Sequence, residues 1–176
     1  MIKINPKSNI KVYDNVLKNY EQHSMFDFCL NSFFTIKGWQ DTATSNESYL
    51  HSNWTLEDLQ KSEFLQYFNI TKILKESDLN VDNFKECVMN VDTLSDSHWM
   101  HTHYENVLLY YINLDWQDGW GGETLFYDAD GKEIIYGSRY TPNRVIVFDG
   151  NIPHTIKHQN RIADKYRMSL SIFFNK

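Results

Sequence analysis

The stretch Val145-Ile-Val-Phe-Asp-Gly-Asn-Ile-Pro-His154 joins an apolar run, a turn signal and a histidine. Its first four residues are β-branched or aromatic, which favours a strand, and Asp149-Gly150 is a typical turn pair. A second predicted strand begins at His154. Short segments of the same kind, separated by turn signals at intervals of about 8–12 residues, fill the chain after residue 83. This pattern predicts a mainly β fold in which two sheets face each other, as in a jelly roll or double-stranded β-helix.

The two halves of the chain differ in their sequence patterns. Helical patterns cover residues 16–30 and 55–68, with Asp14 and Thr55 as the expected N-caps, and residues 10–13 and 33–39 resemble short strands. The strands expected in the second half cover residues 85–94, 98–105, 107–113, 123–127, 133–136, 144–148, 154–158 and 166–174. We therefore expect residues 1–176 to form one domain, with helical support over about 1–84 and a jelly-roll core over about 85–175.

The composition excludes several classes of protein. At 176 residues the chain is shorter than the roughly 250 at which cores usually split, so one active site is expected. Seventeen basic and 23 acidic residues leave a net charge of −6, which disfavours bulk nucleic-acid binding. No apolar run approaches the ~18 residues of a membrane span, and Cys29 and Cys87 lack a zinc or redox spacing. We expect a cytoplasmic protein with no membrane partner; its oligomeric state stays open.

Three histidines are the candidate metal ligands. His101 and His103 are two residues apart, so on a strand both imidazoles project from the same face. The turn before His154 can bring that residue beside them in a jelly roll. Three ligands on one side of an ion leave the other side open, as in non-heme Fe(II) sites. Zinc also accepts three histidines, so these residues alone leave the metal open.

Arg167 and Ser169 form a second candidate group near the start of the last strand, where they share a face. A guanidinium can hold a carboxylate with two parallel hydrogen bonds, so this pair suits the end of a dicarboxylate. The structural alternative for Arg167 is a surface salt bridge with Asp164 or Asp130.

Tyr111 is the third member of this group. Counting by twos from His101 through His103 and Glu105 reaches Tyr111, so without a bulge all these side chains enter one cavity. The Tyr111 phenol could then donate to the same carboxylate. Core packing is the alternative interpretation of this tyrosine.

Five motifs in one order resemble a known family, the iron and 2-oxoglutarate-dependent oxygenases, in its prolyl-hydroxylase-like branch with small phage and marine bacterial members. The motifs are His101-Thr-His103, Leu109-Tyr-Tyr-Ile-Asn-Leu-Asp-Trp116 with Gly121-Gly-Glu-Thr-Leu-Phe126, Val145-Ile-Val-Phe-Asp-Gly150, Pro153-His154 and Arg167-Met-Ser169. The resemblance covers about residues 85–174.

The resemblance implies a role for each of these side chains. His101 and His154 match the family's metal histidines, and Tyr111 and Arg167, assisted by Ser169, match the residues that bind the distal carboxylate of 2-oxoglutarate. The implied cofactors are Fe(II), 2-oxoglutarate as cosubstrate and O2. The implied reaction hydroxylates a C–H bond of a small-molecule or peptide substrate, with a prolyl residue as one candidate, and converts 2-oxoglutarate to succinate.

Two departures from the family pattern bear on this interpretation. The family has His-x-Asp or His-x-Glu where this chain has His103 after His101, so either His103 completes a three-histidine site or His103 and Glu105 are the ligands together with His154. A neutral imidazole in place of a carboxylate raises the charge of the site by one unit. In addition, Asp92 occupies the position of a tyrosine that relatives often carry upstream of the first histidine.

Three other functions fit parts of the pattern. A cupin-like metalloenzyme with three histidines and no 2-oxoglutarate would explain His103. A non-catalytic jelly-roll binding module would explain the strands and the aromatic content. A zinc hydrolase would use Glu105 as a base.

Overall fold

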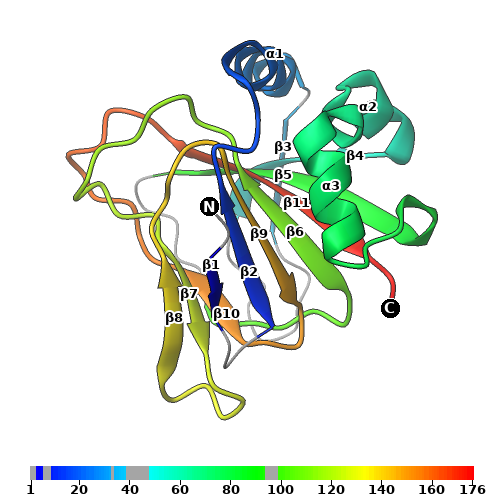
Figure 1. The fold of residues 1–176 in the computed structure, drawn as a ribbon. Helices are drawn as coiled ribbons and strands as arrows, with labels where there is room; N and C mark the ends of the chain where they lie inside the picture. The colour runs from blue at the N-terminus through cyan, green and yellow to red at the C-terminus, as the bar shows by residue number, and fades with distance from the viewer. Residues whose placement is uncertain (1–2, 6–8, 33, 39–47, 94–98) are drawn as a thin grey trace.

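The computed structural model describes residues 3–5, 9–32, 34–38, 48–93 and 99–176, which form two antiparallel sheets with helices on one side (Figure 1). The larger sheet has eight strands in the order β1 (Lys3–Asn5), β2 (Ile10–Asp14), β9 (Arg144–Asp149), β6 (Asn106–Tyr111), β11 (Arg167–Phe174), β5 (Phe84–Asp92), β4 (Ser48–Trp54) and β3 (Thr35–Gly38). The smaller sheet has the order β10 (His154–Ile156), β7 (Thr124–Tyr127) and β8 (Ile134–Ser138). The mainly β architecture predicted for the second half is therefore present.

Alternation along the central strands separates two apolar clusters. Leu108 and Tyr110 of β6 point toward the helices and are buried there with residues of β5 and β11. Val107, Leu109 and Tyr111, one position out of phase, are buried on the opposite face, toward the smaller sheet. Because successive side chains of a strand face opposite ways, β6 serves both clusters. The second face carries the candidate functional groups.

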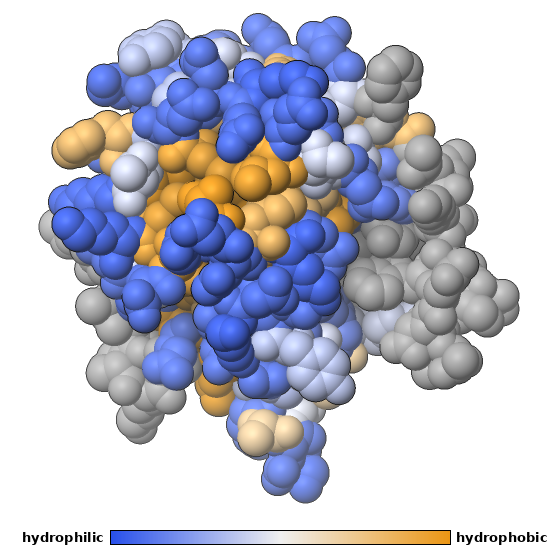
Figure 2. Space-filling view, turned by 90° about the vertical axis from the view of Figure 1, so that its right-hand side faces the viewer, coloured by the Kyte–Doolittle hydropathy of each residue, from blue (hydrophilic) through white to orange (hydrophobic). Residues whose placement is uncertain are grey.

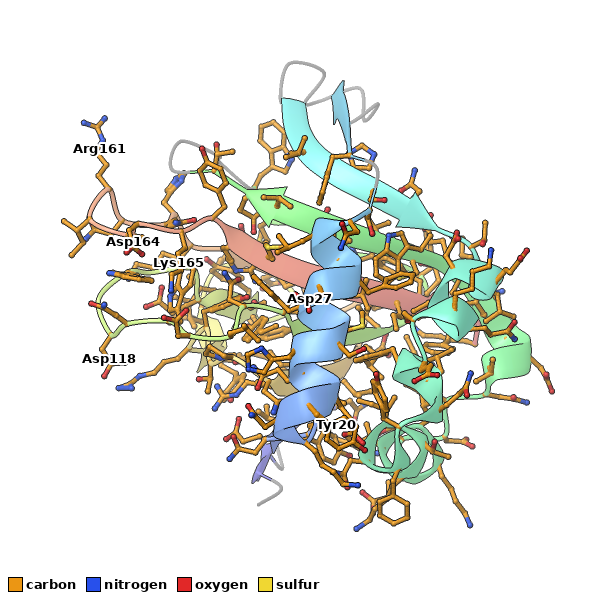
Figure 3. All side chains as sticks on the ribbon, turned by 90° about the horizontal axis from the view of Figure 1, so that it is seen from above. Tyr20, Asp27, Asp118, Arg161, Asp164 and Lys165 are labelled. Atoms are coloured by element: carbon orange, nitrogen blue, oxygen red, sulfur yellow. The ribbon has the colours of Figure 1, made fainter. Side chains whose placement is uncertain are left out.

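The helices cover the outer face of the larger sheet. They are α1 (Asn19–Leu30), α2 (Leu56–Lys61) and α3 (Phe68–Glu76), with the 3-10 turns η1 (Phe64–Gln66) and η2 (Val81–Asn83). Figure 3 shows α1 crossing above β5 and β11, where Met25 and Cys29 are buried. Figure 2 shows the side of α2 and α3, on which hydrophilic residues border a central apolar area. None of the helices in the described part of the chain has the length and apolar content of a bilayer span.

The first half differs from its prediction in three ways. The N-cap of α1 is Lys18 rather than Asp14, because the Glu21 carboxylate accepts the Lys18 backbone N–H at 2.8 Å. The helix predicted over 55–68 ends at Lys61, since Glu63 has a left-handed φ of 59°, and α3 follows as a separate helix. Strands β1 and β4 were not predicted, and they extend the larger sheet together with β2 and β3.

The second half matches its prediction except at residues 98–105. His98, like Phe33 and Trp39 of another predicted strand, lies outside the described residues. Residues 99–105 form no named strand, and His101 makes only an isolated bridge with His154. The predicted strand is therefore wrong as far as the structure describes it, although its pairing partner is the one expected.

Candidate metal centre

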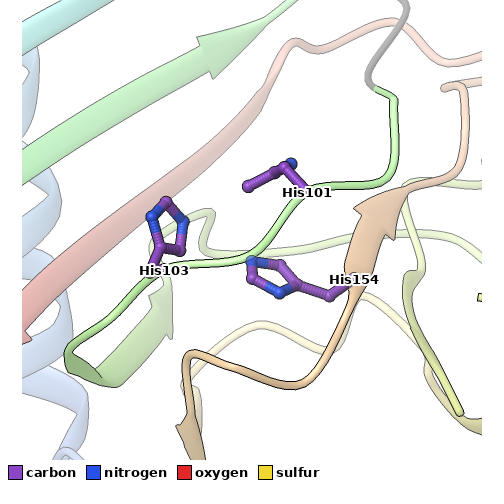
Figure 4. A group of neighbouring side chains, drawn as sticks. All are labelled: His101, His103 and His154. Atoms are coloured by element: carbon purple, nitrogen blue, oxygen red, sulfur yellow. The ribbon is translucent and has the colours of Figure 1, made fainter. Parts of the chain in front are cut away.

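The imidazoles of His101, His103 and His154 meet at one point on the inner side of the fold (Figure 4). One ligand nitrogen from each ring lies within 4.8 Å of the other two. The ring centroids are 4.5 Å apart for His101 and His154, 4.9 Å for His101 and His103, and 5.3 Å for His103 and His154. Two segments that are far apart in the sequence therefore supply one group of possible metal ligands.

Backbone hydrogen bonds hold the two segments side by side. The N–H of His101 donates to the carbonyl of His154 and the N–H of His154 donates back, each at 3.0 Å. The N–H of His103 donates to Gly150 O at 2.7 Å, and the N–H of Gly150 donates to Glu105 O at 2.9 Å. These bonds place the three Cα atoms, and so the positions of the rings depend on backbone pairing and not on the side chains alone.

Two of the rings are also oriented by main-chain carbonyls. His101 Nδ1 lies 3.0 Å from Trp99 O, and His154 Nδ1 lies 2.8 Å from Ile152 O. A carbonyl oxygen only accepts, so in each ring the hydrogen is on Nδ1 and Nε2 keeps its lone pair. This is the usual way in which proteins prepare Nε2 as a metal ligand.

The local environment keeps two of the imidazoles uncharged. Burial, followed by the neighbouring His101, lowers the pKa of His154 to about 3 and that of His103 to about 4. The edges of Phe148 and Phe173 pack against these rings, against His154 and His103 respectively. Since a metal binds the neutral imidazole, these two rings are in the binding form at neutral pH.

Glu105 does not join the three histidines. Its carboxylate accepts a hydrogen bond from Lys85 Nζ, which holds the pKa of Glu105 below its ordinary value. The chain bends at residues 104 and 105 before β6 begins, so counting by twos from His103 does not carry Glu105 into the same group. The structure thus brings His101, His103 and His154 together, and Glu105 is not in this group.

Gly150 is a supporting residue that the sequence marked only as part of a turn. A Cβ at this position would overlap the carbonyl oxygen of Glu105 and lie 2.8 Å from His103 Cβ. We expect Gly150→Ala to displace His103 and to weaken Mn(II) binding by about tenfold or more, the effect typical of lost ligand support. Anaerobic calorimetric titration measures this affinity.

The matched control is Gly137→Ala, whose Cβ would meet only Leu125 Cδ2 at 3.4 Å. Gly137→Ala is expected to bind Mn(II) like the unaltered protein. Equal affinities for both variants would show that the position of His103 does not depend on close backbone contact at Gly150.

Arg167 lies in a second polar group on the same inner face. Its side chain is 0% exposed, and its register partner across β5 and β11 is Asp92. Nη1 donates to Asp92 Oδ2 at 2.6 Å and to Ser169 Oγ at 3.1 Å, while Nε donates to Gly122 O at 2.9 Å. The predicted sharing of one face by Arg167 and Ser169 is thus observed. The alternative of a surface salt bridge with Asp164 or Asp130 is wrong, because Arg167 is fully buried and pairs with Asp92. Asp164 is exposed on the loop before β11 (Figure 3).

Tyr111 faces the same group from β6. Its hydroxyl is 2.7 Å from Thr124 Oγ1, and its ring centroid is 5.3 Å from Arg167 Cζ. Tyr140 was not among the residues predicted for this site. Its ring stacks on that of Tyr111, with 4.4 Å between centroids, and also packs against the guanidinium of Arg167. The structure therefore brings Tyr111, Arg167 and Ser169 together, and adds Thr124 and Tyr140 to them.

Gly122 is the other residue of this group that the sequence marked only as a turn. Its φ is 80°, and a Cβ there would lie 3.0 Å from Arg167 Cδ. The double glycine at 121–122 was the available signal, because a positive φ and close approach of another side chain both favour glycine.

The chain is similar to known proteins in its fold and not in its sequence. No protein-family model matches the chain, and no curated protein sequence matches it significantly. Among solved structures, a prolyl hydroxylase of Trichoplax adhaerens, in complex with a hypoxia inducible factor oxygen degradation domain peptide fragment, has a TM-score of 0.72 at 15% identity, over 96% of this chain and 84% of that one. A 2OG-Fe(II) oxygenase family oxidoreductase of Burkholderia pseudomallei has a TM-score of 0.69 at 13% identity, over 95% and 85%.

A third similar structure is the prolyl-4-hydroxylase of Pseudomonas putida, with a TM-score of 0.64 at 15% identity over 96% of this chain and 93% of that one. These matches span nearly the whole chain, and at such identities they are evidence about the fold. They confirm the predicted jelly-roll class and the predicted likeness to this family. The chain therefore has the fold of the 2OG-Fe(II) oxygenases and prolyl hydroxylases.

Proposed function

We propose that this protein is a non-heme iron dioxygenase that uses 2-oxoglutarate and O2 to hydroxylate a C–H bond of a small-molecule or peptide substrate. One observation carries the proposal: three imidazoles meet on the same inner face as a fully buried arginine, in a fold shared with 2OG-Fe(II) oxygenases. His101, His103 and His154 are the proposed metal ligands, and Tyr111, Arg167 and Ser169 the proposed residues around the distal carboxylate.

The donor set fits Fe(II). Imidazole nitrogens suit iron as well as zinc, and three ligands from one side leave positions for a chelating cosubstrate and for O2. His101 and His154 already have Nδ1 bound to carbonyls, which leaves Nε2 for the ion. When bound, the metal would supply oxygen activation coupled to decarboxylation of 2-oxoglutarate to succinate.

Strand β7 connects the two polar groups. Phe126 is the register partner of His154, and Thr124 is the register partner of Ile156. Thr124 Oγ1 lies 3.4 Å from Arg167 Nη2. Thr124 and Phe126 are two residues apart on β7, which corresponds to about 7 Å along the strand. Arg167 therefore lies near one of these positions and His154 near the other. That spacing suits a short keto diacid with its keto end at the metal and its far carboxylate at Arg167.

The surroundings of His154 shield one side of the three-histidine group from water. His154 is buried, and Phe126 and Phe148 pack against its ring at 6.1 and 4.9 Å between centroids.

The chain segment that carries His101 and His103 also carries three exposed apolar side chains, Trp99, Met100 and Tyr104. These residues are the proposed contact area for the substrate, and the peptide bound by the Trichoplax protein makes a peptide one candidate.

The proposal predicts a cosubstrate chelate that can be seen directly. Adding 2-oxoglutarate to the protein with Fe(II) under anaerobic conditions should produce a metal-to-ligand charge-transfer band in the visible spectrum. His103→Ala should abolish this band, because it removes one of three ligands, while Glu105→Gln should keep it, because Glu105 is bound to Lys85. Absence of the band in the unaltered protein would contradict the proposal.

A second candidate is a three-histidine metalloenzyme that does not use 2-oxoglutarate. One observation favours it: the guanidinium of Arg167 is already paired with Asp92 at 2.6 Å. Formation of succinate under O2 separates the two functions, since only the dioxygenase produces it. Retained metal without succinate would favour the second candidate.

A further inference from the structure

The hydrogen-bond donors of Arg167 are almost all occupied by the protein itself. A guanidinium has five N–H groups. Nε donates to Gly122 O, Nη1 donates to Asp92 and Ser169, and Nη2 lies 3.4 Å from Thr124 Oγ1. Thr124 accepts one N–H of Nη2, so within the described part of the chain the other N–H of Nη2 is left for an incoming ligand.

A carboxylate held by arginine in the strong, bidentate manner needs two parallel N–H donors. Here Nη1 and Nη2 could supply such a pair only if Nη1 gave up one of its two contacts, with Asp92 or with Ser169. The guanidinium has little freedom to turn to another position, because the rings of Tyr111 and Tyr140 lie 5.3 and 5.0 Å from Cζ. The geometry thus sets a second carboxylate in competition with Asp92 and Ser169 for the donors of Nη1.

Charge adds to this competition. Asp92 is 3% exposed and Arg167 is 0% exposed, so the pair is dry and has no net charge. Placing the distal carboxylate of 2-oxoglutarate beside it would leave one buried negative charge without its own partner, which is costly in a dry site. An uncharged group of the same length would add no charge beside this pair.

We propose that Asp92 is a specificity-determining residue that limits both the affinity for 2-oxoglutarate and the preference for a distal carboxylate over an uncharged end. This inference rests on the proposed function. The pairing of Arg167 with Asp92 distinguishes this site from one in which the arginine has no acidic partner before the ligand binds. If Asp92 only oriented Arg167, the Asp92 charge would instead assist the binding of 2-oxoglutarate.

The test compares two 2-oxo acids on the whole protein. The probes are 2-oxoglutarate and 2-oxopentanoate, which has the same chain length and no distal carboxylate, each titrated anaerobically with Mn(II) bound. Asp92→Asn keeps an oxygen that can accept from Nη1 and removes the charge. We expect it to tighten 2-oxoglutarate binding by about tenfold or more and to change 2-oxopentanoate binding by about twofold or less, because only the former gains by loss of the repulsion.

The matched control is Asp14→Asn. Asp14 also pairs with an arginine in the larger sheet, Arg144, whose Nη2 donates to it at 3.0 Å, but it is not among the residues around Arg167. This variant should leave the affinity for both acids unchanged. Weaker 2-oxoglutarate binding by Asp92→Asn, or equal tightening of both acids, would overturn the inference.

Two further measurements test the inference, and the second needs no variant. Thermal unfolding should show 2-oxoglutarate raising the Tm of Asp92→Asn more than that of the unaltered protein, because the tighter ligand stabilises the folded state more.

The unaltered protein itself should prefer 2-oxoglutarate over 2-oxopentanoate by less than about tenfold, whereas an arginine without an acidic partner would give a preference of about 100-fold. A preference of that larger size would overturn the inference even if Asp92→Asn did not fold. Failure of the protein and both variants to bind either acid would instead overturn the proposed function, and with it the inference.

Discussion

His154→Ala is expected to reduce Fe(II) affinity by about 100-fold or more, because removing a direct ligand should cost at least as much as removing the groups that support one. His154 lies at the start of β10, and its ring is within 5.3 Å of both other imidazoles between centroids. The two histidines that remain come from one short segment and offer only two ligand nitrogens. Anaerobic equilibrium dialysis with Fe(II), followed by metal analysis, measures the loss.

The matched control for this prediction is His23→Ala. His23 is an exposed residue of α1 and is not a member of the three-histidine group. We expect this variant to retain one equivalent of iron. If His154→Ala retained it as well, the convergence of the three rings would have no role in metal binding.

Arg167→Met is expected to lower the free energy of unfolding by about 3–5 kcal/mol, because it leaves the buried Asp92 carboxylate without its guanidinium. The side chains of this pair are 0% and 4% exposed, so solvent can do little to compensate. Urea denaturation, monitored by the fluorescence of the tryptophans, gives the change in stability.

The double variant Asp92→Leu with Arg167→Met tests the cause of that loss. With both charges gone, no buried ion is left unpaired, and about half or more of the lost stability should return. A double variant no more stable than Arg167→Met would mean that the destabilisation comes from lost packing against Tyr111 and Tyr140 and not from the isolated carboxylate.

The strands of the second half could be predicted because their signals are local. The β-branched and aromatic run 145–148 and the turn pair after it give β9 and the start of β10 close to the predicted positions. The same holds for β6 and β11, where alternation also identified which side chains share a face. Such patterns reflect the pleat of the strand itself and need no knowledge of its neighbours.

Local patterns were less informative where neighbours decide the structure. Residues 98–105 have the composition of a strand, yet the described part of this segment is held by a few bonds to Gly150 and His154 and bends at Glu105. The polar strand β4 forms because its backbone pairs with β5, from Leu50 opposite Val91 to Trp54 opposite Cys87. Pairing partners of this kind are supplied by the fold, and intrinsic strand preference is weak beside them.

The sequence by itself determined the types of side chain available to this site: three histidines on two segments, an arginine and a serine in one strand, and a tyrosine in another strand. The tertiary structure alone decided that Asp92 is the partner of Arg167 and that Glu105 binds Lys85. Asp92 and Arg167 are 75 positions apart and meet because β5 and β11 pair in a register that places them directly opposite each other. That register is set by which faces of the strands are buried in the assembled sheets, a property that no single segment contains.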